Sequence, residues 1–147
     1  MREIEASGVI RAPLDRAWAW WTDFGEVGEL FVIDHGVSRT RRRVIAREGD
    51  ALVLEERGAG PKPGMLLVRH RVTILPAERA LREEVTFPAR VVTRWEFRED
   101  PEGTRVTRRV DRRGLARLAP AGLSRRWVQR DLDAHVAAAN RELTQAA

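Results

Sequence analysis

The chain has 147 residues, of which 43% are apolar, a length and composition that fit one globular domain and exclude an intrinsically disordered chain. It contains no cysteine, which excludes disulfides, thiolate metal sites and cysteine nucleophiles. Its 27 basic residues, among which Lys62 is the only lysine, exceed the 22 acidic residues and give a net charge of +5, a mild excess that identifies no anionic partner.

The N-terminal region begins with a predicted strand over residues 3–11, which Ala12-Pro13 ends. Proline suits the first position of a helix. An apolar helical stripe with the spacing i, i+3, i+4, i+7 follows and consists of Leu14, Ala17, Trp18 and Trp21. Residues 25–28 end this helix, and residues 29–33 predict one further short turn of helix.

The middle of the chain, from about Ser38 to Arg113, changes to a period of two and predicts six strands separated by glycine and proline turns. Such short connections indicate antiparallel neighbours. The longest helical pattern runs from Ser124 to Thr144, and its apolar side consists of Val128, Leu132, His135, Val136, Ala139 and Leu143. The order of elements predicts one α+β domain over residues 1–147.

The alternation of apolar and charged residues divides the predicted sheet into two faces. The apolar face includes Val68, Val72, Val85, Phe87, Val91, Trp95 and Phe97. The other face carries arginines and acids together, which indicates a solvated surface with weak ion pairs. Because the tryptophans do not lie among these arginines, the surface is not typical of a nucleic-acid platform.

Three polar residues interrupt the apolar face: His70, Glu83 and Arg108. A buried charge needs a partner or water, so these residues predict a polar spot in a cavity. Since residues 76–79 close a hairpin, strand parity places His70 opposite or diagonal to Glu83. On the C-terminal helix, His135 lies in the apolar stripe, with Asp131 one turn earlier. The alternatives are hydrogen-bonded core histidines and an arginine that reaches the rim.

The opening Val9-Ile10-Arg11-Ala12-Pro13-Leu14-Asp15-Arg16-Ala17-Trp18, followed by Thr22-Asp23-Phe24, resembles the start of the START-like, helix-grip superfamily. This group includes polyketide cyclase/dehydrase-like and coenzyme-Q-binding proteins. The resemblance covers nearly the whole chain, although Ala17 replaces a common valine, and it concerns the fold more than the chemistry. It implies a curved seven-stranded antiparallel sheet wrapped around the long C-terminal helix, with one or two short helices after the first strand. It also implies a deep cavity, with residues 34–36 and 58–64 at its rim.

Binding or carriage of a small, largely hydrophobic or aromatic molecule in that cavity is the leading hypothesis. The expected contacts are Val68, His70, Val72, Glu83, Val85, Phe87, Val91, Trp95, Phe97, Arg108, Leu132, His135 and Ala139. The alternative is an aromatase/cyclase- or dehydratase-type enzyme. In that enzyme His70 and Glu83 would act as the acid–base pair, and Arg108 would stabilise an enolate.

Other classes of partner are less favoured by the sequence. Protein interaction through the basic surface, including residues 41–43, is a third hypothesis. A metal site from His35, His70 and His135 lacks close ligand spacing, so no metal or other cofactor is predicted. The charged N-terminus and the absence of an apolar stretch of about 20 residues predict a cytoplasmic protein without membrane insertion, either monomeric or homodimeric.

Overall fold

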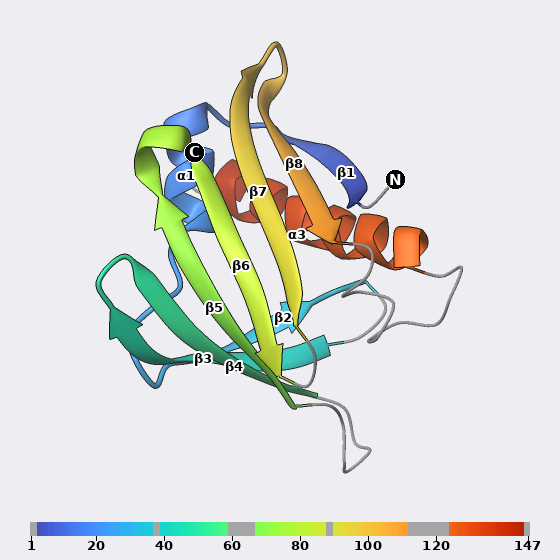
Figure 1. Ribbon diagram of the computed structural model, residues 1–147. Helices are drawn as coiled ribbons and strands as arrows, with labels where there is room; N and C mark the ends of the chain where they lie inside the picture. Colours follow the sequence, from blue (N-terminus) through green and yellow to red (C-terminus); the bar gives the residue numbers. More distant parts are fainter. Residues whose placement is uncertain (1–2, 37–38, 59–66, 88–89, 112–123, 146–147) are drawn as a thin grey trace.

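The computed structural model describes residues 3–36, 39–58, 67–87, 90–111 and 124–145 (Figure 1). The strands are β1 (Glu3–Ile10), β2 (Leu30–Asp34), β3 (Arg39–Glu48), β4 (Ala51–Gly58), β5 (Leu67–Leu75), β6 (Ala80–Phe87), β7 (Val91–Asp100) and β8 (Gly103–Asp111). The helices are α1 (Leu14–Trp21), the short 3-10 helix η1 (Pro76–Glu78) and α3 (Ser124–Gln145). Apart from Gly58, the predicted rim loop 58–64 lies outside the described residues.

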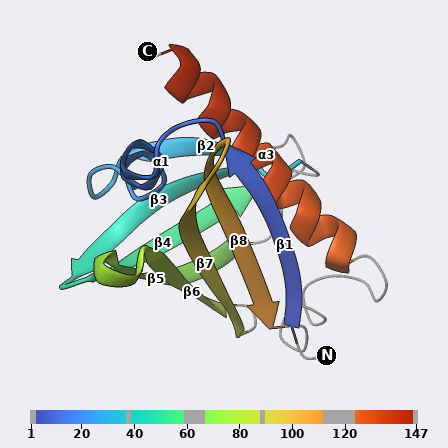
Figure 2. The ribbon, with the colours of Figure 1, turned by 90° about the horizontal axis from the view of Figure 1, so that it is seen from above.

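The strands form one antiparallel sheet in the order β1-β8-β7-β6-β5-β4-β3-β2. The helix α3 packs on β1 and also contacts β2, so both edges of the sheet meet the same helix. Viewed from above, the sheet curls beside α3 (Figure 2). The predicted α+β helix-grip fold is therefore confirmed, with eight strands among the described residues in place of the expected seven.

The additional strand is β2, which corrects the prediction of a helical turn over residues 29–33. Its residues pair in register with β3, for example Phe31 with Arg42 and Val32 with Arg41. Exposed and partly buried positions alternate along it, as a strand requires. A short apolar run fits either a helical turn or a strand, and here the branched and aromatic residues of the segment Phe31-Val32-Ile33 favoured the strand.

Phe87 corrects a second expectation, because it does not face the interior. His70 pairs with Val85 whereas Arg69 pairs with Phe87, so β6 carries one extra residue, Thr86, at a bulge. A bulge reverses the alternation of faces beyond it. Phe87 therefore shares the outer face with Arg69 and is 48% exposed.

The core lies between the sheet and the two longer helices. The predicted inward orientation of Val72, Val85, Val91, Trp95 and Phe97 is confirmed by their burial, and Val68 packs on the edge of the core. Trp18 and Trp21 of α1 both contact Phe97, with ring centroids 5.4 Å apart in each pair. This aromatic contact fixes α1 against the sheet.

The 22-residue helix α3 buries one stripe and exposes the other face. The buried stripe comprises Val128, Leu132, Val136 and Ala139, whose spacing matches the helical period. Among the described residues, no helix combines the length and the apolar composition required to cross a bilayer.

We predict that Gly103→Ala lowers the free energy of unfolding by about 3 kcal/mol, since φ is 139° and a Cβ would lie 2.3 Å from the carbonyl oxygen of Ile10. Gly49→Ala is the matched control, because φ is 64° but nothing lies within 4 Å of the added Cβ. Its loss should be about 1 kcal/mol. Urea unfolding measures both values, and equal losses would contradict the close approach of Gly103 to β1.

Candidate functional site

A cavity of about 300 Å³ lies between the inner face of the sheet, α1, β2 and α3. Five aromatic residues contribute to its wall: Trp20, Trp21, Phe24, Phe31 and Trp95. Its polar lining consists of Asp23, Asp34, Arg42, Glu83, His135 and Glu142. An apolar cleft with a few convergent polar groups has the general character of a small-molecule site.

Eleven of the thirteen residues expected from the sequence to contact a ligand occupy three environments, whereas Val68 lies partly buried at the edge of the core and Phe87 is exposed on the outer face. Four of them line the cavity: Val72, Glu83, Trp95 and His135. Five others are buried in the hydrophobic core: Val85, Val91, Phe97, Leu132 and Ala139. His70 and Arg108 are buried in a group of polar residues beside the cavity. The structure therefore divides the expected set into cavity wall, apolar core and a buried polar layer.

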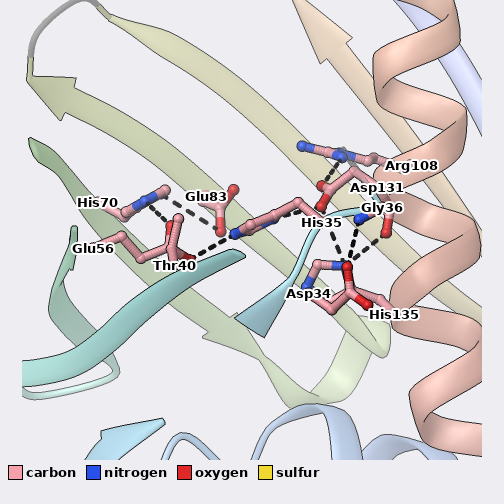
Figure 3. Close-up of polar contacts among 10 residues, drawn as sticks. All are labelled: Asp34, His35, Gly36, Thr40, Glu56, His70, Glu83, Arg108, Asp131 and His135. Carbon is pink, nitrogen blue, oxygen red and sulfur yellow. Dashed lines mark hydrogen bonds and ion pairs between the residues drawn. The ribbon is translucent and has the colours of Figure 1, made fainter. Parts of the chain in front are cut away.

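Seven residues form what we call the polar cluster (Figure 3). It extends across the interior from β4 and β5 to α3 and consists of His35, Thr40, Glu56, His70, Arg108, Asp131 and His135. Every member has a charged or hydrogen-bonding partner in the cluster. The residues come from four strands, the segment that follows β2 and one helix, so the fold must be complete before the cluster exists.

His35 is the centre of the cluster. Its Nδ1 lies 2.6 Å from Oδ1 of Asp131, and its Nε2 lies 2.8 Å from Oγ1 of Thr40 and 3.1 Å from Oε1 of Glu56. Burial alone would favour the neutral ring, but the hydrogen bonds with Asp131 and Glu56 outweigh it and raise the pKa of His35 to about 10. His35 is therefore an imidazolium at neutral pH.

The end of β2 brings His35 close to α3. Asp34 accepts a hydrogen bond from the backbone N–H of Gly36, at 2.8 Å, and this short turn follows the strand directly. Gly36 has φ of 81°, and a Cβ there would lie 2.8 Å from the carbonyl oxygen of Arg130 on α3. Glycine at this position thus allows the chain to approach the helix closely enough for His35 to reach Asp131.

Glu56 connects His35 with His70. Its Oε2 lies 2.7 Å from Nε2 of His70, but the two groups are poorly aligned, and neither ring nitrogen of His70 has a hydrogen-bond partner among the described residues. Burial opposes the charge of His70, whereas Glu56 and Glu83 raise its pKa. Burial likewise opposes the charge of Glu56, but His35 and His70 hold its pKa well below the usual value. Nδ1 of His70 lies 3.9 Å from Oε2 of Glu83, which confirms the predicted diagonal pair.

Asp131 anchors the other end of the cluster on α3. Its Oδ2 accepts a hydrogen bond of 2.5 Å from Nη1 of Arg108, while its backbone carbonyl is 2.7 Å from Nδ1 of His135. Burial would raise the pKa of Asp131, but His135, His35 and Arg108 lower it well below the usual value. The guanidinium of Arg108 also lies 4.5 Å from the ring centroid of Trp95. Arg108 is therefore neutralised inside the protein and does not reach the rim.

Arg42 was missed as a site residue by sequence reasoning, which grouped it with the basic surface of residues 41–43. The alternation along β3 places it on the same face as Thr40 and the buried Val44. Its guanidinium lies 5.1 Å from the ring centroid of Phe24, and the residue lines the cavity. Burial lowers the pKa of Arg42 in spite of the charges of Glu56 and Glu83. The sequence did contain one indication: Arg42 lies two positions before the apolar Val44, and residues two positions apart on a strand share a face.

His35, Asp131 and His135 offer three possible metal ligands within 4.8 Å of one another. The hydrogen bonds that these residues already form compete with coordination of a metal. Both ring nitrogens of His35 face carboxylates or a hydroxyl, and Asp131 is already paired with Arg108. A cation would have to displace the His35 proton and compete with a buried guanidinium. The arrangement of charges thus favours the hydrogen-bonded cluster over a metal centre.

Comparisons with known proteins agree with the resemblance noted at residues 9–24. A family model described as "Polyketide cyclase / dehydrase and lipid transport" matches residues 1–144. A solved structure of a Thermus thermophilus protein is 20% identical, with a TM-score of 0.63 over 95% of this chain and 98% of that chain. The Zhui aromatase/cyclase from Streptomyces sp. R1128 is 16% identical, with a TM-score of 0.62 over 97% and 95% of the two chains.

The di-domain ARO/CYC BexL, from the BE-7585A biosynthetic pathway, is also 16% identical, with a TM-score of 0.53 over 95% of this chain and 48% of that chain. At such identities these structures show a shared fold only. The search of curated proteins found no match.

The charges of the cluster predict a stability maximum between about pH 5 and pH 6.5. Folded His35 keeps its proton up to a pKa of about 10, whereas the unfolded chain releases it near 6.5, so its stabilisation is lost as the pH rises from about 6.5 to 10. Glu56 and Asp131 have lowered pKa values, so their stabilisation is lost as the pH falls below the usual carboxyl range. Chemical denaturation at a series of pH values measures both slopes.

The variant His35→Gln tests whether His35 causes the loss of stability at alkaline pH. It should show a smaller loss of stability between pH 7 and pH 10 than the parent chain, with a residual slope from His70, whose pKa is also raised. An unchanged slope in the variant would show that His35 does not carry the buried charge.

Proposed function

Because the chain belongs to the polyketide cyclase/dehydrase and lipid transport family, we propose that it binds a small, largely hydrophobic molecule with an aromatic ring system. The binding site is the cavity between the sheet and α3. The observation that carries this proposal is the aromatic wall of the cavity. Trp21 and Trp95, whose ring centroids are 5.4 Å apart at an interplanar angle of 52°, give flat surfaces that suit a planar ligand.

The size of the cavity narrows the class of ligand. About 300 Å³ is at the lower end of the usual range for small-molecule pockets. A compact ligand of two or three rings fits that space better than a long acyl chain. Glu83 from β6 and His135 from α3 supply polar groups in the wall that orient it. Their positions are fixed in turn by contacts with His70 and Asp131.

The neutral compound 2-acetylnaphthalene is a suitable probe, and isothermal titration calorimetry measures its binding. Ala138→Trp introduces a large side chain at the cavity wall and should weaken binding at least tenfold. Ala137→Trp is the matched control, because this adjacent position on α3 is exposed and does not line the cavity. This control should leave the affinity unchanged.

Two results would contradict the proposal. One is that neither 2-acetylnaphthalene nor another two-ring compound binds the parent chain. The other is that Ala137→Trp weakens binding as much as Ala138→Trp, which would place the ligand outside the cavity.

A second candidate function is proton transfer of the aromatase/cyclase or dehydratase type, favoured by the acid–base pair of Glu83 and His70. In this reaction a proton leaves the carbon beside a ligand carbonyl for the Glu83 carboxylate, and the electron pair moves onto the carbonyl oxygen. The role first expected for Arg108 does not suit its surroundings, since Asp131 already neutralises it. The family description and the names of the similar aromatase/cyclases are compatible with this candidate.

Hydrogen–deuterium exchange distinguishes the enzyme from the carrier. In D₂O, the enzyme should exchange the methyl protons of 2-acetylnaphthalene faster than buffer alone, as followed by proton NMR. Glu83→Gln should reduce the catalysed rate at least tenfold and leave the affinity within about twofold, because the change removes the base and keeps the shape. Binding without exchange in the parent chain would exclude the catalytic candidate and leave the carrier.

A further inference from the structure

Arg42 is a cation at the cavity wall for which the described part of the chain offers no close counter-ion. Its side chain makes no hydrogen bond and no ion pair within 4.0 Å to any described residue, although it lines the cavity and is only partly exposed. The guanidinium lies over the ring of Phe24, at 5.1 Å from the centroid. A guanidinium stacked on an aromatic ring keeps its N–H groups free for another partner.

The contrast with Arg108 shows why this is unusual. Arg108 is buried, but it has Asp131 at 2.5 Å and the ring of Trp95 at 4.5 Å. Withdrawing a charge from water without a partner is costly, and the cost is removed when an opposite charge enters the site. The structure thus leaves at Arg42 a position where an anion would be stabilised.

The nearest carboxylates are engaged elsewhere. Glu56 lies between His35 and His70, and Glu83 lies 3.9 Å from His70. Both carboxylates act on the charge of Arg42 and raise its pKa, but burial outweighs them and neither forms an ion pair with the guanidinium. The guanidinium of Arg42 is therefore left without an ion pair among the described residues, and an anionic group of a ligand would supply one.

Three further carboxylates line the cavity and must be considered: Asp23, Asp34 and Glu142, whose Oε2 accepts a hydrogen bond from Nε1 of Trp20. Asp34 has one oxygen 2.8 Å from the backbone N–H of Gly36, and Asp23 has one oxygen 3.1 Å from that of Gly25. None of the three forms an ion pair with Arg42. They carry negative charge along part of the wall, so an anionic group is favoured at Arg42 and disfavoured beside these three residues.

We propose that Arg42 forms an anion subsite in the cavity and that the ligand is an aromatic compound bearing a planar oxyanion, such as a carboxylate. A planar guanidinium donates two parallel N–H groups to such an anion. The ring system of the ligand contacts the aromatic wall. This inference rests on the proposed binding function and specifies the chemical class of its ligand.

The test compares 2-naphthoate with 2-acetylnaphthalene, which has nearly the same shape but no charge, by isothermal titration calorimetry at pH 7. The parent chain should bind 2-naphthoate at least tenfold more tightly. Arg42→Gln should abolish this preference and leave the affinity for 2-acetylnaphthalene within about threefold. Arg41→Gln is the matched control, because it removes the same charge from the exposed face of β3 and should keep the preference.

The folding of the variants gives an independent check. Arg42→Gln should unfold at the same or a higher urea concentration than the parent chain, because the charge that it removes has no close partner. Arg108→Gln should unfold at a clearly lower concentration, since it leaves Asp131 and its charge without the guanidinium. A large loss of stability in Arg42→Gln would indicate a structural partner and overturn the inference.

The remaining outcomes separate the subsite from the binding function. Equal affinity of the parent chain for both naphthalenes would overturn the subsite while the proposed function stands. Binding of neither compound would overturn both. Loss of the preference in Arg41→Gln to the same extent as in Arg42→Gln would assign it to the general positive charge of the protein and also overturn the subsite.

Discussion

The contact of His35 with two carboxylates is the interaction on which the interior depends. His35 follows β2, Glu56 lies on β4 and Asp131 lies on α3, so one imidazolium joins the edge of the sheet, its middle and the helix. The next residue on α3, Leu132, is fully buried in the hydrophobic core. Close packing of that kind leaves little free volume. The cavity lies beside the polar cluster, where aromatic and charged side chains make up much of the wall between the helix and the sheet.

A cluster of this kind adds little net stability. Buried ion pairs lose their hydration, and apolar replacements of similar shape are often as stable or more so. Its effect on position is clearer, because it fixes the side chains at the cavity wall. Glu83 is held near His70 and His135 is tied to Asp131, so the polar groups that face a ligand are supported by groups that do not. This division between a supporting layer and a contacting layer is typical of binding and catalytic sites.

Much of the fold could be predicted from the sequence because local periodicity records which residues face the core. The same parity placed His70 opposite or diagonal to Glu83 across a hairpin, and the structure has the diagonal arrangement. Parity gave the wrong face for Phe87, because a single inserted residue at a bulge reverses the faces. The alternation of apolar and polar residues does not reveal this bulge. Local periodicity also failed for residues 29–33, where five residues are too few to separate a helical turn from a strand. Contacts between distant segments, such as His35 with a residue 96 positions away, have no local signal at all.

Arg42 and Arg108 have different surroundings that the sequence alone does not reveal. Both are arginines on the inner face of a strand, and the alternation pattern does not distinguish their chemistry. The difference arises from α3, because its Asp131 forms an ion pair with Arg108, whereas no described carboxylate of α3 forms one with Arg42. The first guanidinium is a structural cation with a satisfied charge, and the second is free to recognise a ligand. In the proposed site, the placement of one carboxylate on the helix therefore decides which arginine is available to a ligand.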